Sequence, residues 1–375
     1  MINRSLVFRG PFCAALLTAA LAFGASPACA DGDLSKVNHI IIMMQENRSF
    51  DNYLGALPYA KGTPYHASKA PKGSTIPVCK PTDHKCVDSL TCTKATKKKP
   101  MACTNANPDP NGNVVTAFHQ TNYCPGPDFD HTWVGGHKML NFSNPDDTLT
   151  SPPMDGFIRY NALTELPNQA NGPPWDTMGF YNEVDLPFYY FLAENFAIDD
   201  RYFGGVLAQT FPNHGYALAA TSFGHLTTAE IGELFVHPPG PYMPINGSIF
   251  DLLNGNNITW TSYHADIEDY SLLFAPISSH QQPVSQFATD AAAGTLPAVA
   301  FVWACGFPDC NINGTTFETD EHPPSNIQAG EYFVYQNLTA LRNGPNWNDS
   351  IVFILHDEWG GLYDHVPPPA AAQNS

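Results

Sequence analysis

Two acidic clusters each follow a short apolar run, and together they could hold a metal ion. Glu46 and Asn47 come just after the run IIIMM, and Asp357 and Glu358 come just after the run IVFIL. Three carboxylates cannot stay close together and ionised without a cation, because like charges raise one another's pKa. Carboxylate and amide oxygens suit Ca²⁺, Mg²⁺ or Mn²⁺, whereas an added imidazole would favour zinc or iron. Alternatively, each cluster merely caps the helix that follows its strand.

A threonine in a turn could supply a nucleophile to such a site. Thr210 lies in the stretch QTFPNHGYALAAT, just before small residues that predict a helix. A bound metal would lower the pKa of its hydroxyl, and N–H groups at the start of a helix can hold phosphate. The same position would equally suit an ordinary N-cap threonine.

Histidine is the side chain best suited to exchanging protons near neutral pH. Three of the 14 histidines stand close in sequence to acidic residues that could fix their tautomer: His131, His264 and His322. We treat these three as candidates for proton transfer and expect most of the others to be structural or exposed.

Strands that alternate with helices must position these residues. The alternation predicts an α/β fold in which a mostly parallel sheet is sandwiched by helices. In such sheets ligands lie beyond the carboxyl ends of the strands, which is where Glu46 and Asp357 would meet. Strands are predicted at residues 39–44, 258–264 and 298–305 and at the run IVFIL, and helices at residues 187–197 and 328–344.

The first thirty residues predict a signal peptide. Arg4 and Arg9 precede the apolar stretch CAALLTAALAFGA, and a small-x-small pattern ends at Ala30. The apolar stretch is short for a membrane span, and no later stretch is long and apolar enough to cross a bilayer. We therefore expect a secreted or periplasmic protein, cleaved near Ala30, with one domain over residues 31–375.

The charge of the exported chain excludes some partners. Two of the 17 Lys and Arg residues lie in the predicted signal peptide, which leaves 15 against 35 acidic residues and a net charge of −20. Such a surface disfavours nucleic acid as a partner, because the phosphate backbone needs a positive counterface. The oligomeric state is not predicted by the sequence.

Cysteines concentrate in one polar segment. Five of the seven cysteines after residue 30 lie in residues 79–124, within a predicted loop insertion over residues 60–127. Disulfides would stabilise a segment with so little apolar content. Zinc is the alternative, although the segment has no CxxC pair. We expect Cys305 and Cys310 to pair, and one of the seven thiols to be free or bonded to another chain.

Four motifs make the sequence resemble a known family. They are QENRSFDNYLG, QTFPNHGYALAAT, DEHPP and HDEWGGLYDHVPPP, and they occur in the family's order between residues 39 and 369. The sequence resembles the bacterial phosphoesterase family, which includes non-haemolytic phospholipases C and acid phosphatase A type enzymes. The family belongs to the alkaline phosphatase superfamily, so the resemblance implies an alkaline-phosphatase-like α/β fold.

The resemblance also implies a cofactor and its ligands. One divalent metal ion, which could be Ca, Mg, Mn, Fe or Zn, would be held by Glu46, Asn47, Thr210, Asp357 and Glu358. The nucleophiles of the family are Ser or Thr, which Thr210 fits.

The remaining site residues follow from the same comparison of motifs. Three histidines of the family surround the phosphoryl group. His322 matches through DEHPP, and His131 and His264 match by their order in the chain. Asn213 and His214 would bind substrate. Many relatives have Arg at the position of His214, so a phosphate-facing charge is either missing or supplied by His214 itself.

The implied function is a secreted, metal-dependent hydrolase of phosphoric mono- or diesters that acts through a covalent phosphothreonine. The substrate would be a small phosphoester or a phospholipid. A sulfatase would need a C/S-x-P-x-R motif, whereas Thr210 is followed by Phe-Pro-Asn. Members of the family usually continue beyond VPPP, so we expect a C-terminally shortened domain with an unpaired edge strand. The alternative is a truncated, inactive secreted binding protein that keeps the fold.

Overall fold

The computed structural model describes most of the chain after residue 32. The described residues are 33–69, 79–145, 151–166, 172–228, 244–265, 279–306, 311–312, 315–316 and 318–370. The predicted signal peptide lies outside them, so export after cleavage near Ala30 stays a prediction. The chain separates into a short unit that ends at Asn38, with the 3₁₀ helix η1 (Leu34–Lys36), and a large unit that begins at His39.

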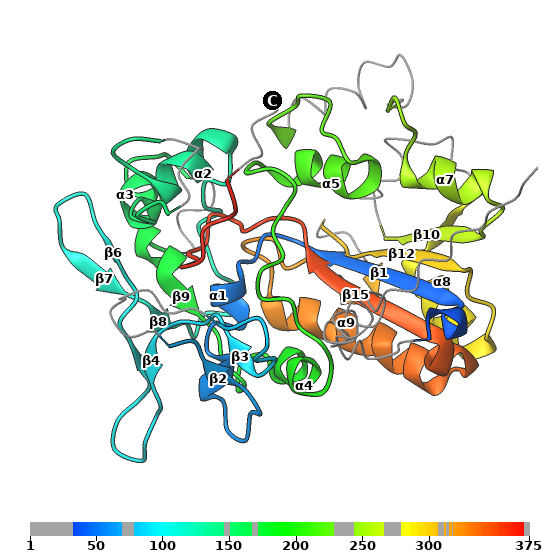
Figure 1. Cartoon of the computed structure of the whole chain (residues 1–375), viewed down its shortest axis with the longest axis horizontal. Helices are drawn as coiled ribbons and strands as arrows, with labels where there is room; N and C mark the ends of the chain where they lie inside the picture. Colours follow the sequence, from blue (N-terminus) through cyan, green and yellow to red (C-terminus); the bar gives the residue numbers. More distant parts are fainter. Residues whose placement is uncertain are drawn as a thin grey trace, which may run out of the picture. The chain divides into compact units, whose positions relative to one another are not determined.

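A five-stranded sheet runs through the large unit, with β1 and β15 side by side (Figure 1). All four pairs of neighbouring strands are parallel, which confirms the predicted sheet. In spatial order the strands are β11 (Gln281–Pro283), β10 (Trp260–His264), β12 (Val299–Trp303), β1 (His39–Gln45) and β15 (Ser350–His356).

Helices cover both faces of this sheet, as the apolar pattern of β1 requires. The core cluster that contains Ile41 and Met43 includes residues of α4, α8 and α9. The cluster that contains Met44 and Phe301 includes residues of α5 and α7. Successive side chains of a strand point to opposite faces, so β1 is apolar on both. The helices are α4 (Pro187–Asn195), α8 (Val284–Ala293), α9 (Ile327–Asn343), α5 (Thr210–Ala219) and α7 (Ile249–Gly255).

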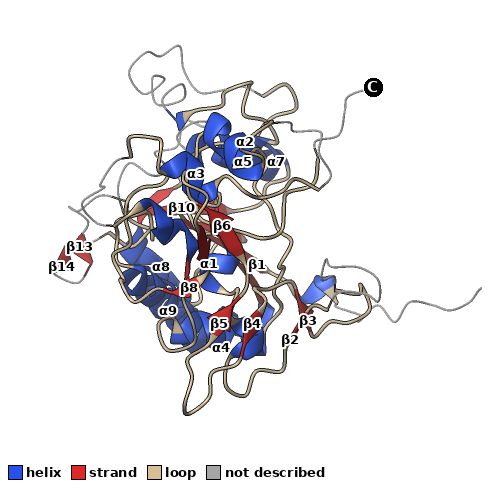
Figure 2. Cartoon of the chain, turned by 90° about the vertical axis from the view of Figure 1, so that its left-hand side faces the viewer, coloured by secondary structure: helices blue, strands red, loops and turns tan. Residues whose placement is uncertain are grey.

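The predicted insertion over residues 60–127 forms short ladders as well as loops, and these lie outside the central sheet (Figure 2). Its pairs are β2 (His66–Ala67) with β3 (Cys86–Val87), β4 (Cys92–Thr93) with β5 (Ala102–Cys103), and β6 (Ala106–Pro108) with β7 (Val114–Thr116); β8 (Phe118–His119) pairs with β9 (Gly179–Phe180). Strands of two or three residues are too short to show a periodicity, so they could not be predicted from the sequence.

The remaining elements are short. They are α1 (Phe50–Tyr53), η2 (Leu57–Tyr59), α2 (Trp133–Leu140), α3 (Phe157–Asn161), η4 (Pro174–Met178), β13 (Asn311–Ile312), β14 (Thr315–Thr316) and η6 (Pro345–Asp349). No helix among the described residues is long and apolar enough to cross a membrane.

Disulfides hold the insertion, as expected. Cys79 bonds to Cys86, and Cys92 bonds to Cys103, so these four cysteines are not available to zinc. Cys124 is free and exposed, which agrees with the odd count. Cys305 is disulfide-bonded, whereas its predicted partner, residue 310, lies outside the described residues.

Candidate active site

The register of β1 on β15 brings the two acidic clusters together. Gln45 pairs with His356 at the last position of the ladder, so Glu46 and Asp357 leave the sheet next to each other. The N–H of Asp357 donates to the Gln45 carbonyl at 3.1 Å, and the N–H of Glu46 donates to the Asp320 carbonyl at 2.7 Å. Two apolar runs that end in acids therefore become one acidic edge, as the sheet topology predicted.

The turn after β1 is held closely against the turn after β15. Asn47 is fully buried with a left-handed φ of 57°, and its N–H donates to Oδ1 of Asp357 at 2.9 Å. The N–H of Arg48 donates to the Glu358 carbonyl at 3.1 Å. Gly360 also has a positive φ, and a Cβ there would lie 2.3 Å from the Asn47 carbonyl oxygen. A glycine is therefore needed for this approach of the two turns.

Thr210 joins this edge from α5, of which it is the first residue. Thr210 is 6% exposed, and its side chain lies close enough to the Asp357 carboxyl to lower the pKa of that acid, against the larger effect of burial, which raises it. The N-cap of α5 is Gln209, so the alternative reading of Thr210 as an ordinary N-cap is wrong. The hydroxyl points to the acidic edge, which suits a nucleophile.

Asn213 fixes the loop that leads into α5. Its Oδ1 accepts from the Val206 N–H at 3.1 Å, and its Nδ2 donates to the Ala208 carbonyl at 2.8 Å. These bonds give Asn213 a positioning role for Thr210, three residues earlier. Its predicted contact with substrate stays a prediction.

His214 lies beside the acids that were predicted to bind metal. Its Nε2 is 3.8 Å from Oε1 of Glu46 and 4.0 Å from Oδ2 of Asp357. The ring is 1% exposed and lies 5.5 Å from the Trp303 ring, centroid to centroid. Burial lowers the pKa of His214 to about 3, so the imidazole is neutral at physiological pH. The structure thus places among the acids a residue that was predicted to bind substrate.

His131 and His322 form a pair at the same site. Their ring centroids are 6.1 Å apart, and with Asp128 they offer ligand atoms within 4.8 Å of one another. Nδ1 of His131 donates to the Phe129 carbonyl at 2.7 Å, and Nδ1 of His322 donates to the Pro323 carbonyl at 2.8 Å. Each ring is therefore oriented by a backbone carbonyl, which leaves its Nε2 for chemistry.

Electrostatic contacts connect this histidine pair to the acidic edge. Burial alone would lower the pKa of His131, but Glu358 and Asp128 outweigh it and raise the pKa to about 9. Burial raises the pKa of Glu358 to about 8. Burial also raises the pKa of Asp357, against the hydrogen bonds that it accepts from backbone N–H groups. Two buried acids with raised pKa values thus lie where a bound cation would stabilise their ionised form.

His264 occupies the carboxyl end of β10 and is half-buried. It lies at the same carboxyl edge of the sheet as Glu46 and Asp357, although β12 separates β10 from β1. Its catalytic role stays a prediction.

A buried glutamate that sequence reasoning missed ties the motifs together. Glu321 is fully buried, and its carboxylate contacts His356 Nε2 at 3.0 Å and accepts from the Tyr189 hydroxyl at 2.7 Å. Its carbonyl accepts a hydrogen bond from Arg48. Gly330 gives it room, because a Cβ there would lie 2.1 Å from the Glu321 Cγ. Glu321 therefore supports the segments that carry the site.

The chain is similar to one known protein family and to several phospholipases C. The model of the phosphoesterase family matches residues 37–375. Phospholipase C B of Mycobacterium tuberculosis is 29% identical, over 93% of this chain and 63% of its own length. Non-specific phospholipase C4 of Arabidopsis thaliana is 28% identical, over 89% of this chain and 55% of its own length. The chain thus spans little more than half the length of these relatives.

Proposed function

Because this chain belongs to the phosphoesterase family, we propose that it hydrolyses phosphoric esters at the carboxyl edge of its central sheet. One observation carries the proposal. The buried Thr210 side chain lies beside the Asp357 carboxyl, whose pKa it lowers against the effect of burial, at the point where β1 and β15 bring Glu46 and Asp357 side by side. A hydroxyl held against buried acids is the arrangement that a metal-activated nucleophile needs.

The side chains at this edge fit a divalent metal ion. Asn47 Oδ1, Asp357 Oδ2 and Glu358 Oε1 are buried and have no hydrogen-bond partner within the described part of the chain. Leaving such oxygens unsatisfied is costly, and a cation would satisfy them. We propose that these three residues hold one divalent ion together with Glu46 and Thr210. When bound, the ion would lower the pKa of the threonine hydroxyl and neutralise charge on the phosphoryl group.

Thr210 is the proposed nucleophile. Its Oγ1 forms a bond to phosphorus while the bond from phosphorus to the ester oxygen breaks. The Thr210 side chain lowers the pKa of the Asp357 carboxyl against the effect of burial, so this acid lies close enough to receive the proton. The product is a phosphothreonine, which water then cleaves to phosphate or a phosphomonoester and free Thr210.

Histidines complete the proposed reaction. The alcohol that leaves needs a proton, and His322 and His264 are the proposed donors. His131 lies beside His322 and its pKa is raised to about 9. It would therefore be positively charged and would stabilise the equatorial phosphoryl oxygens.

We predict that Thr210→Ala lowers kcat by more than about 10³-fold, because the covalent route loses its nucleophile. Hydrolysis of p-nitrophenyl phosphate and of p-nitrophenylphosphorylcholine, each with added divalent ions, measures this. The ratio of the two rates for the unaltered protein tells a phosphatase from a phospholipase C-like diesterase.

The matched control is Thr104→Ala, which removes an exposed threonine hydroxyl of the insertion. Its rates should equal those of the unaltered protein. Unchanged turnover in Thr210→Ala would rule out the nucleophile. A folded, unaltered protein that hydrolyses neither substrate with any of the five metals would support the inactive binding protein.

A further inference from the structure

His214 stands on the same face of α5 as the proposed nucleophile. Residues four apart on a helix are neighbours, so α5 directs the Thr210 hydroxyl and the His214 imidazole to one place. His214 Nε2, Glu46 and Asp357 offer ligand atoms within 4.8 Å of one another. Since zinc binds nitrogen and carboxylate ligands at about 2 Å, a cation among these three atoms is within reach of all of them.

The separations around His214 do not suit direct hydrogen bonds. Its Nε2 lies 3.8 Å and 4.0 Å from the two carboxylate oxygens, beyond the range of a hydrogen bond. Asp357 Oδ2, one of these two oxygens, is buried without a hydrogen-bond partner among the described residues. The gap between the imidazole and the acids is therefore of the size that an ion, rather than a proton, would bridge.

We propose that His214 is a ligand of the divalent metal ion and that it biases the site towards zinc or iron over calcium, magnesium and manganese. Imidazole favours zinc and iron, whereas all-oxygen sites suit calcium, magnesium and manganese. This inference rests on the proposed metal site and adds to it a residue and a metal preference. It replaces substrate binding as the role of His214.

Equilibrium metal binding tests this role without any measurement of activity. His214→Gln should lower the affinity for Zn²⁺ by more than about a hundredfold, since even second-shell partners of metal ligands are worth 10- to 100-fold. Its affinity for Mg²⁺ should change by less than about threefold, because an imidazole contributes little to magnesium sites. The visible spectrum of the Co²⁺-loaded protein gives a second readout, because it changes when a nitrogen ligand is lost.

The matched control is His137→Gln, another buried histidine on a helix, which contacts backbone on α2. It should bind Zn²⁺ and Co²⁺ as the unaltered protein does. Unchanged zinc affinity and cobalt spectrum in a folded His214→Gln would overturn the assignment and leave the proposed function standing. A protein that binds no divalent ion, before any substitution, would overturn both.

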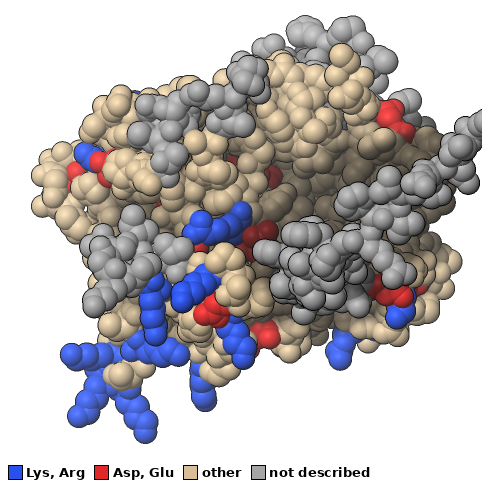
Figure 3. All heavy atoms as spheres, viewed as in Figure 1, with Lys and Arg blue, Asp and Glu red and all other residues tan. Residues whose placement is uncertain are grey.

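The basic residues of the chain are concentrated in one segment. Nine of the 17 Lys and Arg residues lie between residues 61 and 99, all of them lysines, against two acids in that segment. The whole chain has a net charge of −18. Figure 3 shows basic side chains gathered at the lower left, where Figure 1 places β4. The cations are thus concentrated rather than spread over the surface.

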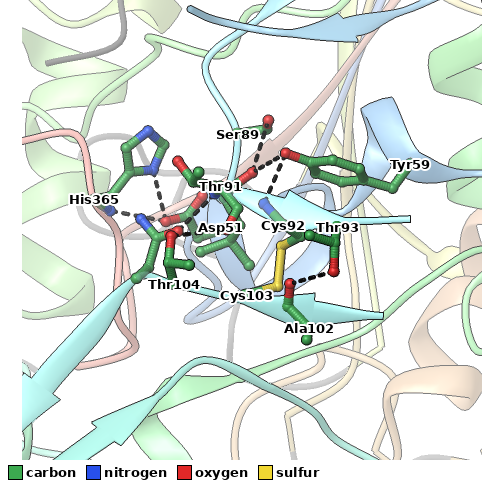
Figure 4. Close-up of a disulfide and its surroundings, with 12 residues drawn as sticks. Asp51, Tyr59, Ser89, Thr91, Cys92, Thr93, Ala102, Cys103, Thr104 and His365 are labelled. Atoms are coloured by element: carbon green, nitrogen blue, oxygen red, sulfur yellow. Dashed lines mark hydrogen bonds and ion pairs between the residues drawn. A yellow bond between two sulfur atoms is a disulfide. The ribbon is translucent and has the colours of Figure 1, made fainter. Parts of the chain in front are cut away.

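These lysines include four on a hairpin that is fixed at its base, here named the lysine hairpin (residues 92–103). Cys92 bonds to Cys103 across β4 and β5, as Figure 4 shows. The Cys92 N–H donates to the Tyr59 hydroxyl at 2.9 Å, which ties the hairpin to the body of the protein. Thr96 and Lys99 form a bridge, so Lys97 and Lys98 make the exposed turn.

We infer that the lysine hairpin docks on an anionic lipid bilayer. The hairpin contains no Arg and no aromatic residue, so it lacks the groups with which proteins stack on nucleic acid bases. The Debye length is about 10 Å at 0.1 M salt, so a bilayer that meets the tip is attracted mainly by the lysines nearest to it. Each lysine near an anionic bilayer contributes about a fivefold gain in partitioning.

The test is co-sedimentation with vesicles of phosphatidylcholine, with or without phosphatidylserine, on the Thr210→Ala background so that no lipid turns over. The variant Lys97→Gln with Lys98→Gln should lose about twentyfold or more in binding to the anionic vesicles. The control is Lys36→Gln with Arg342→Gln, which removes the same charge from exposed positions elsewhere. It should lose less than about threefold.

Three outcomes would overturn the inference. The first is equal binding to the two kinds of vesicle, and the second is equal loss in the hairpin variant and the control. The third is binding to duplex DNA as tight as to the anionic vesicles at one ionic strength, which would indicate a general polyanion site. None of them bears on hydrolysis, so the proposed function is tested separately.

Discussion

Two clusters in this molecule are built from the same kinds of residue, yet they differ in the protonation of their histidine. Each combines two carboxylates with one histidine, and each draws one acid from the segment after β1 and one from the segment after β15. The strand-end cluster is Glu46, Asp357 and His214, and the clamp cluster is Asp51, Asp364 and His365.

The clamp cluster neutralises itself. Both the N–H and Nδ1 of His365 contact Oδ2 of Asp51 at 2.8 Å (Figure 4), and Asp364 accepts from the Asp51 N–H at 3.3 Å. Burial would lower the pKa of His365, but Asp51 outweighs it and raises the pKa to about 9. A charged imidazole therefore faces the acids and ties the C-terminal motif to α1.

The strand-end cluster has no such internal cation. Burial lowers the pKa of His214 to about 3, so a neutral ring faces Glu46 and Asp357. Thr210 lowers the pKa of Asp357 against the effect of burial but brings no charge. The difference teaches that acids near a histidine are not a site by themselves; the protonation state of the histidine decides whether a metal is needed.

The largest expected contrast between the clusters is in activity. Asp357→Asn should lower kcat/KM by about 10³-fold or more, because it removes a proposed metal ligand beside the nucleophile. Asp364→Asn, the same substitution in the clamp cluster, should stay within about tenfold. Steady-state hydrolysis of the better of the two p-nitrophenyl substrates measures both variants.

Stability gives a second test of Asp364→Asn. Asp364 accepts from the N–H groups of Asp51 and Val366, but burial and Asp51 raise its pKa to about 7, so at about pH 8 the folded protein bears a cost for ionising this carboxyl that a neutral Asn removes. Asp364→Asn should therefore raise the unfolding free energy at about pH 8 by about 1 kcal/mol or more, even with one hydrogen bond of about 1 kcal/mol lost, and chemical denaturation measures this change. Equal losses of activity in the two variants would erase the proposed distinction between a metal site and a structural clamp.

The two acids of the strand-end cluster could be predicted from local sequence. An unbroken apolar run that turns polar at once marks the exit of a buried strand, and parallel sheets bind ligands there. That rule placed Glu46 and Asp357 together although they lie more than 300 residues apart, and β1 on β15 bears it out. Thr210 was a candidate from its turn, but a threonine there equally suits an N-cap, and the family resemblance was needed to choose between the two.

The partners that balance charge were not predictable from spacing. Asp51 and His365 both lie in motifs that the sequence displays, but 314 positions separate them and no periodicity links them. Glu321 lies in the motif DEHPP, in which His322 was the residue predicted to act in catalysis. The contacts of Glu321 are with Tyr189 and His356, which belong to two other elements. His214 was predicted to bind substrate. The sequence alone does not show that α5 turns this side chain towards Glu46.

The smallest predicted effect is a pH dependence that belongs to the clamp cluster. The folded pKa of His365 is about 9, above the ordinary value of 6.5, so its contribution to stability is complete below pH 6.5 and is lost as pH rises through 9. The unfolding free energy should therefore fall by about 1–2 kcal/mol more between pH 7 and pH 9 in the unaltered protein than in His365→Gln. Chemical denaturation across this range measures the difference.

Between pH 7 and pH 9 the change in stability that comes from the clamp cluster is due mainly to His365. Burial and Asp51 raise the pKa of Asp364 to about 7, so the free-energy cost of ionising this carboxyl develops as pH rises towards 7 and changes little above it. His131 also titrates near pH 9, but it is present in both proteins and cancels in the comparison. Parallel stability curves would mean that the imidazole is not charged in the folded state. The clamp cluster would then be as unbalanced as the strand-end cluster, and the contrast between the two would fail.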